Sequence, residues 1–212
     1  MSVDHVEVLV EEPSMEAALR LLLPRILGNL PHEVFPFQCK DELLERLPQR
    51  MQGYANRMRS DPWFRDHVRV VVVVDRDNDQ CVALKQRLDR MVKDVGLVPR
   101  SPGSNSRWTV VNRLAIEELE AWYFGDWAAV RAAYPNVPAT IPSRAGFRDP
   151  DAVAGGTWEA FERELQRAGY FRGGLRKIEA ARAIAARMEP ARNTSRSFGK
   201  LRSVLVEIAA VR

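Results

Sequence analysis

The stretch VVVVVDRDND at residues 70–79 joins five consecutive valines to three aspartates at alternating positions. A continuous run of β-branched residues is typical of a central strand that is buried on both faces of a parallel sheet. We therefore predict a strand over residues 68–75. A turn explains one or two aspartates, so three of them (Asp75, Asp77 and Asp79) indicate that a cation binds where the strand ends.

The segments around the valine run alternate between strand and helix patterns. Further strands are expected at residues 6–10, 32–37 and 107–115, and helices at 14–28, 41–58, 79–96 and 116–134. Ser14 is expected to cap the first helix, Pro24 and Pro48 to kink or interrupt two of them, and Gly125 to break the last. This alternation predicts an α/β fold, a Rossmann-like and mostly parallel sheet flanked by helices.

The last third of the chain has a different pattern. Residues 135–157 contain four prolines and three glycines and have no regular period, so we expect an irregular connector there. Helical patterns follow at residues 157–169, 175–188 and 197–211. The expected organisation is a catalytic core at residues 1–134 and a basic helical extension at residues 135–212 that packs on it as one globular unit. The apolar end of the last helix, residues 204–211, also offers a surface to a second copy of the chain.

Acidic residues follow three of the predicted strands. Glu11 and Glu12 follow the first strand, and the aspartates follow the valine strand. Glu117, Glu118 and Glu120 open the helix after the last strand. Parallel strands bring their carboxyl ends to one edge of the sheet, where such folds place their sites. Crowded carboxylates repel one another unless a cation neutralises them, and oxygen ligands without nearby Cys or His favour Mg²⁺ or Mn²⁺.

Several of these acidic residues also have a purely structural interpretation. A turn accounts for Asp77 and less well for Asp75, the last residue of the strand, and Asp79 is expected to cap the following helix. Glu117 and Glu118 would favour a helix N-terminus through the helix dipole, and Glu120 is in a position to pair with Arg113.

Charge is distributed unevenly along the chain. Residues 1–130 contain 17 Lys and Arg against 20 Asp and Glu, whereas residues 131–212 contain 15 against 8. A basic segment of this kind fits contacts with nucleic-acid phosphates, docking on a partner protein, or a solvated helical surface. The candidate phosphate contacts are Arg172, Arg176, Lys177, Arg192, Arg196 and Lys200.

Composition excludes several classes of protein. No segment approaches the roughly 18 apolar residues of a membrane span, and the acidic N-terminus does not resemble a secretory signal, so we expect a cytoplasmic protein without a membrane partner. Cys39 and Cys81 are too few and too isolated for a disulfide framework or a zinc site.

Two segments resemble a known domain. VLVEEPSMEAAL with VVVVVDRDND is similar to the TOPRIM domain of topoisomerases, primases and OLD nucleases, which has a glutamate after its first strand and D-x-D after its third. The resemblance is closer to the TOPRIM-related family of unknown function 4276 (DUF4276), whose ordered blocks span nearly the whole chain. These blocks are EEPS (residues 11–14), DRD with C-x-x-L-K (75–85), ELEAW-x-x-GD (118–126), GGTWEA (155–160) and SRSF (195–198).

The resemblance implies a role for each matching residue. Glu11 would be the TOPRIM glutamate, a metal ligand or general acid/base, and Asp75 and Asp77 the metal-binding pair, with Glu118 or Glu120 as a further ligand. Glu12 stands where TOPRIM domains usually have glycine. OLD nucleases also use a late lysine, and the resemblance leaves open whether Lys177, Lys200 or neither takes that place.

The activity implied is metal-dependent hydrolysis of phosphodiester bonds in DNA or RNA, including tRNA. Some relatives resemble effector nucleases of phage-defence systems of the PARIS type, so the implied partner is an ABC-like or AAA-type ATPase. A non-catalytic subunit that docks on such an ATPase, and a phosphatase or phosphotransferase acting on a small molecule, remain alternatives.

Overall fold

A computed structural model describes residues 2–101, 108–153 and 155–211 of the chain. Within these residues four parallel strands form one sheet in the order β2-β1-β3-β4. The strands are β1 (His5–Val10), β2 (His32–Pro36), β3 (Val68–Asp75) and β4 (Val110–Ala115). The predicted α/β fold with a parallel sheet is therefore confirmed. Arg107, the first residue of the last predicted strand, lies outside the described residues.

The valine strand is the central element, because β3 lies between β1 and β4 and all eight of its residues are buried. Alternate side chains of a strand point to opposite faces of the sheet. Val71 and Val73 accordingly belong to a first hydrophobic cluster, and Val70, Val72 and Val74 belong to a second. This two-sided burial is why the segment contains no polar alternation before Asp75.

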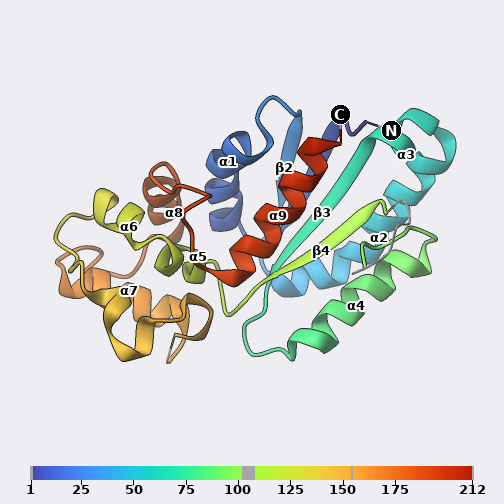
Figure 1. Ribbon diagram of the computed structural model, residues 1–212. Helices are drawn as coiled ribbons and strands as arrows, with labels where there is room; N and C mark the ends of the chain where they lie inside the picture. The colour runs from blue at the N-terminus through green and yellow to red at the C-terminus, as the bar shows by residue number, and fades with distance from the viewer. Residues whose placement is uncertain (1, 102–107, 154, 212) are drawn as a thin grey trace.

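Helices cover both faces of the sheet (Figure 1). Those with side chains in the second cluster are α2 (Lys40–Ser60), α3 (Pro62–His67) and α4 (Cys81–Asp94). Those with side chains in the first cluster are α1 (Pro13–Leu27), α5 (Glu120–Gly125), α6 (Trp127–Ala133), α7 (Thr157–Arg167), α8 (Lys177–Ala185) and α9 (Arg196–Ala210).

The interruption predicted near Pro48 is wrong, because Pro48 lies inside the uninterrupted helix α2. Pro24 likewise lies inside α1, which continues to Leu27. A proline within a helix removes one backbone hydrogen bond and costs about 3 kcal/mol. In α2 that cost is offset by the buried side chains of Leu43, Leu47 and Met51, which line one face of the uninterrupted helix. The break at Gly125 is confirmed, since α5 ends there and α6 begins at Trp127.

Two predicted helix caps are also wrong. The N-cap position of α1 belongs to Glu12 and that of α4 to Gln80, rather than to Ser14 and Asp79. The hydroxyl of Ser14 instead donates a hydrogen bond to the side chain of Glu12. Pro13 explains the shift in α1, because proline is preorganised for the first position of a helix.

The irregular connector predicted at residues 135–157 contains three short 3₁₀ helices, η1 (Ile141–Ser143), η2 (Ala145–Phe147) and η3 (Pro150–Ala152). Helices α5 to α8 gather beyond the carboxyl ends of the strands, and α9 returns along the sheet to the amino end (Figure 1). There Val3 N donates to Val211 O at 2.7 Å, so the ends of the described chain lie side by side.

The N-terminal and C-terminal parts of the chain share one hydrophobic cluster. The first hydrophobic cluster contains Leu19 and Leu23 of α1 together with Ile184 of α8 and Leu205 of α9. Among the helices the structure describes, none is long and apolar enough to cross a membrane.

Candidate active site

Glu11 and Asp75 lie side by side at the carboxyl edge of the sheet. Glu11 directly follows β1, Asp75 is the last residue of β3, and these two strands are paired neighbours with Val10 opposite Val73. The backbone N–H of Asp75 donates to Glu11 Oε2 at 2.8 Å. Both side chains are buried, with 8% of Glu11 and 5% of Asp75 exposed. The fold therefore places two adjacent carboxyl groups in an environment of low polarity.

Glu120 brings a third buried acid from the start of α5 and is 2% exposed. Among the described residues, neither Glu120 Oε2 nor Asp75 Oδ1 has a hydrogen-bond partner. A buried carboxylate oxygen without a partner is unfavourable by at least about 1–3 kcal/mol. These two oxygens are therefore poised to accept a proton or to bind a cation.

Burial and mutual repulsion control the ionisation of this group. Burial raises the pKa of Asp75 well above its usual range, and the charges of Glu11 and Glu120 raise it further. Burial also raises the pKa of Glu11 to about 7, although the hydrogen bond from Asp75 N favours the ionised carboxylate and lowers that pKa. The pKa of Glu120 is likewise raised by burial to about 7, although Lys177 lies close enough to lower it. We call Glu11, Asp75 and Glu120 the buried triad.

Lys177, the first residue of α8, is a cation close to Glu120 and Asp75. Its Nζ lies 3.6 Å from Glu12 Oε2 and 5.7 Å from the ring centroid of Trp158. Burial opposes its charge, but the carboxylates of Glu120 and Glu12 keep the pKa of the ammonium raised. Of the two lysines left open by the sequence, Lys177 is therefore the one at this edge, whereas Lys200 is exposed on α9.

Asp77 and Asp79 are tied to a lysine that sequence reasoning missed. Lys40 Nζ lies 3.0 Å from Asp77 Oδ2 and 2.6 Å from Asp79 Oδ2, and it donates to the carbonyl of Arg76 at 2.9 Å. Asp79 is thus an ion-pair partner rather than the predicted helix cap. The signal for Lys40 was its place just after the second strand, at the same edge as the acids.

Glu117 and Glu118 are also engaged in structural contacts. Glu117 pairs with Arg76. Glu118 Oε2 accepts hydrogen bonds from Thr157 Oγ1 and Trp158 N, both at 2.9 Å, at the start of α7. The pairing considered for Glu120 with Arg113 is not formed, since Arg113 donates to the carbonyls of Lys200 and Asn112.

The buried triad fits a hard divalent cation in its donor chemistry, because it offers carboxylate oxygens, two of them without partners. Yet in residues 2–101, 108–153 and 155–211, no group of three or more His, Cys, Asp or Glu side chains is arranged to hold a metal ion. Coordination at this edge therefore requires side-chain rotation or oxygen ligands from water or substrate.

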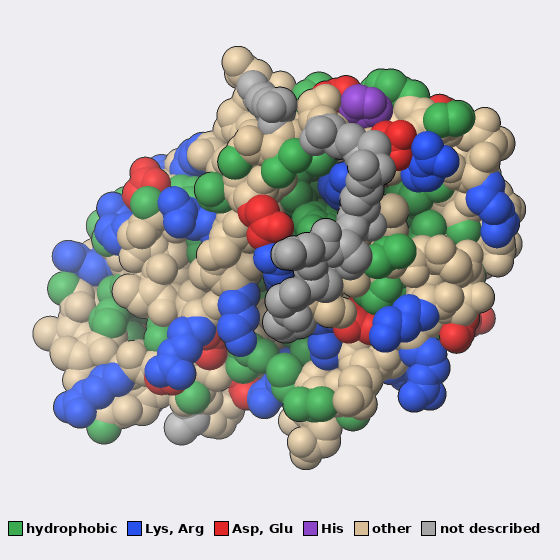
Figure 2. Space-filling view, turned by 45° about the vertical axis from the view of Figure 1, so that its right-hand side comes forward, with side chains coloured by type: hydrophobic (Ala, Val, Ile, Leu, Met, Phe, Trp, Pro, Cys, Tyr) green, Lys and Arg blue, Asp and Glu red, His purple; other side chains and the backbone are tan. Residues whose placement is uncertain are grey.

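Three of the predicted phosphate-binding residues are paired with acidic side chains. Arg192 contacts Asp126 through two hydrogen bonds of 2.9 Å, and Arg176 pairs with Glu179 at 2.8 Å. Arg196 lies 3.7 Å from Asp149. Arg172 is exposed, as is Lys200. On the face shown in Figure 2, Lys and Arg side chains are spread over both ends with acidic side chains among them.

The fold and this edge define the class of protein: a Rossmann-like α/β protein with buried acids at the carboxyl edge of a parallel sheet. More particularly, the chain belongs to the family described as "Domain of unknown function (DUF4276)", whose sequence model matches residues 10–205. The resemblance to that family is therefore confirmed, and the matched range includes the whole buried triad and Lys177.

Comparison with solved structures gives a match to the C-terminal region of the Burkholderia pseudomallei OLD protein. The match has 15% sequence identity, covers 99% of this chain and 100% of that one, and has a TM-score of 0.47. No curated protein matches the chain.

Proposed function

We propose that this protein is a Mg²⁺- or Mn²⁺-dependent nuclease whose active centre is the buried triad. The observation that supports this most directly is the pair of buried oxygens, Asp75 Oδ1 and Glu120 Oε2, which have no hydrogen-bond partner among the described residues. Glu11 is bonded to the backbone N–H of Asp75. A stable fold rarely keeps three repelling acids in its interior without a use for them, and perturbed carboxyls at a sheet edge are typical of functional sites. The TOPRIM resemblance of the same residues points to the same chemistry.

Each residue of the buried triad would have a role that follows from its position. Asp75 and Glu120 would supply oxygen ligands from adjacent elements, and Glu11 would supply either a further ligand or a proton acceptor. A bound divalent cation would polarise the phosphoryl oxygen and lower the pKa of water. With a pKa of about 7, Glu11 can exchange a proton with water or with a leaving oxygen near neutral pH.

Lysine side chains at the same edge would position the substrate. Lys177 is held beside Glu12 and over Trp158, from where its ammonium can contact a phosphate of a polyanion entering the edge. Lys40 holds Asp77 and Asp79 in ion pairs, and a substrate phosphate that attracted Lys40 would release both aspartates toward a cation. The exposed Arg172 and Lys200 would add weak contacts that do not depend on sequence.

Cleavage of mixed DNA and RNA with Mn²⁺ or Mg²⁺ tests this function. We expect cleavage by the wild-type protein and at least a 100-fold loss in Asp75→Asn and Glu120→Gln, with unchanged circular dichroism. Glu33→Gln, which removes an exposed acid in the middle of β2, is the matched control and should retain activity. Full cleavage by Asp75→Asn would remove the assignment.

A second candidate is a non-catalytic subunit that docks on an ABC-like or AAA-type ATPase. The absence of a preformed three-ligand group among the described residues favours it. It predicts no cleavage even when such an ATPase is added, and no metal binding at the buried triad. If the protein instead hydrolyses only small phosphate esters in the same assay, the polymer substrate is wrong.

A further inference from the structure

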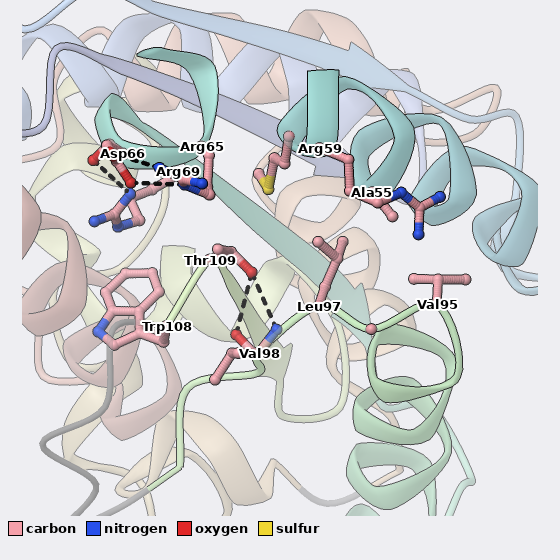
Figure 3. Close-up of a pocket in the computed structure, with 12 residues that line it drawn as sticks. Ala55, Arg59, Arg65, Asp66, Arg69, Val95, Leu97, Val98, Trp108 and Thr109 are labelled. Carbon is pink, nitrogen blue, oxygen red and sulfur yellow. Dashed lines mark hydrogen bonds and ion pairs between the residues drawn. The ribbon is translucent and has the colours of Figure 1, made fainter. Parts of the chain in front are cut away.

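A cavity of about 390 Å³ lies on the other side of the molecule from the buried triad. Its walls come from the end of α2, from α3 and the first residues of β3, and from the segments after α4 and before β4 (Figure 3). These are the amino ends of the central strands, whereas Glu11 and Asp75 lie at the carboxyl ends. Small-molecule sites typically have volumes of about 300–1,000 Å³, so the cavity is large enough for a ligand.

The charged side chains of the cavity favour an anion. Arg59, Arg65 and Arg69 line it against a single acid, Asp66. Arg65 forms paired contacts with Asp66 at 3.0 and 3.1 Å. Guanidinium groups suit phosphate because their planar N–H donors match its oxygens in pairs.

Arg69, near the start of β3, differs from Arg59 and Arg65 in its burial. Only 9% of Arg69 is exposed, whereas the other two arginines are exposed. Arg69 Nη1 donates to the backbone carbonyls of Val68 at 2.8 Å and Asp66 at 3.3 Å, which fixes the side chain in place. Burying a positive charge is unfavourable without a compensating anion. The nearest acid to the buried Arg69 is Asp66, whose carboxylate also binds Arg65.

The remaining walls are apolar and partly flat. The indole of Trp108 lies below Arg69 in Figure 3, with the Arg69 guanidinium carbon 5.7 Å from the ring centroid. The buried side chains of Met58 and Leu97 line the same cavity. An aromatic ring would pack against this wall through dispersion and stacking, as nucleobases do on aromatic and guanidinium planes.

We propose that this cavity is a second ligand site that binds a phosphorylated nucleoside. The phosphate would contact Arg65 and Arg69, and the base would pack on Trp108 and Leu97. The ligand is either a free mononucleotide or the phosphorylated end of a nucleic acid, since both carry this chemistry. The site does not depend on the buried triad, which stands at the opposite edge of the sheet.

Isothermal titration calorimetry in EDTA tests the proposal, because chelation silences any metal-dependent cleavage and leaves binding alone. The titrants are AMP, ATP, inorganic phosphate, and a short oligonucleotide with and without a 5′-phosphate. We expect at least one mononucleotide or the 5′-phosphorylated oligonucleotide to bind, and to bind at least about tenfold more tightly than inorganic phosphate. The double variant Arg59→Ala/Arg65→Ala removes two exposed arginines and should weaken that binding at least about tenfold.

Two controls separate the ligand site from other effects. Arg87→Ala removes an exposed arginine of α4 that is not part of the cavity, and it should bind like wild type. Asp75→Asn should also retain binding, so a failure of the nuclease assignment leaves this result intact. Trp108→Leu tests the base contact and should reduce the preference for a nucleotide over phosphate.

Binding of mononucleotides alone identifies a small-molecule site, and binding of the 5′-phosphorylated oligonucleotide alone identifies a nucleic-acid end. The proposal is overturned if no titrant binds at millimolar concentration. It is also overturned if the double variant binds as tightly as wild type, or if inorganic phosphate binds as well as the nucleotides.

Discussion

Asp75 shows how the position of one residue creates chemistry. The valines that precede it in β3 are buried in the core, and Asp75 is the last residue of that strand. Its carboxyl group therefore lies at the end of the strand, next to the core. One of its oxygens has no hydrogen-bond partner among the residues that the structure describes, and the charges of Glu11 and Glu120 repel its own. A turn would place such an aspartate toward solvent, so the burial of Asp75 argues against a simple turn residue and supports its proposed role.

Ionisation of the buried triad should make stability depend on pH. Glu11 and Glu120 have a folded-state pKa of about 7 against an ordinary 4.5. A raised pKa contributes stability that is present below pH 4.5 and is lost as pH rises through 7, on the order of 3 kcal/mol for Glu120. We expect the melting temperature in EDTA to fall between pH 5 and 8, and Glu120→Gln to flatten that slope. An unchanged slope in Glu120→Gln, with Glu33→Gln as control, would contradict these pKa values.

Gly125 in the ELEAW-x-x-GD block is required by close packing. A Cβ atom there would overlap Asn193 Oδ1 and lie 2.8 Å from Ser195 N. Gly125→Ala should therefore destabilise the protein by about 1–3 kcal/mol in urea denaturation. Gly53→Ala, in the open middle of α2, should instead stabilise it by about 0.5–1 kcal/mol. Equal effects of the two substitutions would show that the contact with Asn193 and Ser195 is unimportant.

At the scale of elements, Asp126 joins α6 to the segment that precedes α9. Its carboxylate accepts from Ala129 N as the cap of α6, from Glu189 N at 2.8 Å, and from Arg192. The side chain is 1% exposed, so these hydrogen bonds form in a desolvated place. The family blocks at residues 118–126 and 195–198 are therefore explained in part by packing between α5, α6 and α9.

Loss of this junction should be costly. Asp126→Ala removes a helix cap and leaves Glu189 N without its partner, so we expect a loss of about 2–4 kcal/mol in unfolding free energy. Arg192→Ala should cost about 1 kcal/mol or less, because its side chain is 51% exposed. Chemical denaturation measures both. Comparable losses would show that the ion pair, rather than the cap and backbone contact, holds the junction.

The last helix buries most of the apolar face that was expected to offer a surface to a second copy of the chain. Residues 204–211 were considered as a surface for a second subunit, but Val204, Leu205 and Ile208 are buried in the protein's own core. Only Val206 and Val211 of the large apolar side chains in that segment are exposed. The feature that suggested a homo-oligomer is therefore largely used within the chain.

At the scale of the whole molecule, the sheet separates the two proposed sites. Acids and Lys177 lie at the carboxyl edge, whereas Arg59, Arg65 and Arg69 surround a cavity at the amino edge. Parallel strands make this possible, because all of their carboxyl ends lie at one edge of the sheet and all of their amino ends lie at the other. A metal-dependent reaction at one edge and an anion bound at the other would not compete for the same side chains.

Metal binding should stabilise the whole fold if the buried triad holds a cation. We expect 5 mM Mn²⁺ to raise the melting temperature by several degrees at pH 8 and by less at pH 6, because protons compete for the same oxygens. Asp75→Asn should lose the effect. A melting temperature that Mn²⁺ leaves unchanged at both pH values would argue against a metal at this edge.

Much of the architecture was readable from local patterns. The valine run predicted a central buried strand, the alternation of elements predicted a parallel sheet, and strand ends predicted where Glu11, Asp75 and Glu120 would gather. These features depend on periodicity and burial, which neighbouring residues specify. Proline positions were misleading because helix breaking is a local tendency that burial of a helix face overrides.

Which charged side chains pair with one another was decided only by the tertiary structure. Nothing in residue spacing shows that Lys40 pairs with Asp77 and Asp79, that Glu118 holds the start of α7, or that Lys177 rather than Lys200 reaches the acids. Such contacts join residues 37 to about 165 positions apart, as with Lys40 and Asp77 at the near end and Glu12 and Lys177 at the far end. Their formation depends on how helices pack on the sheet, and this packing determines which of many similar charges meet.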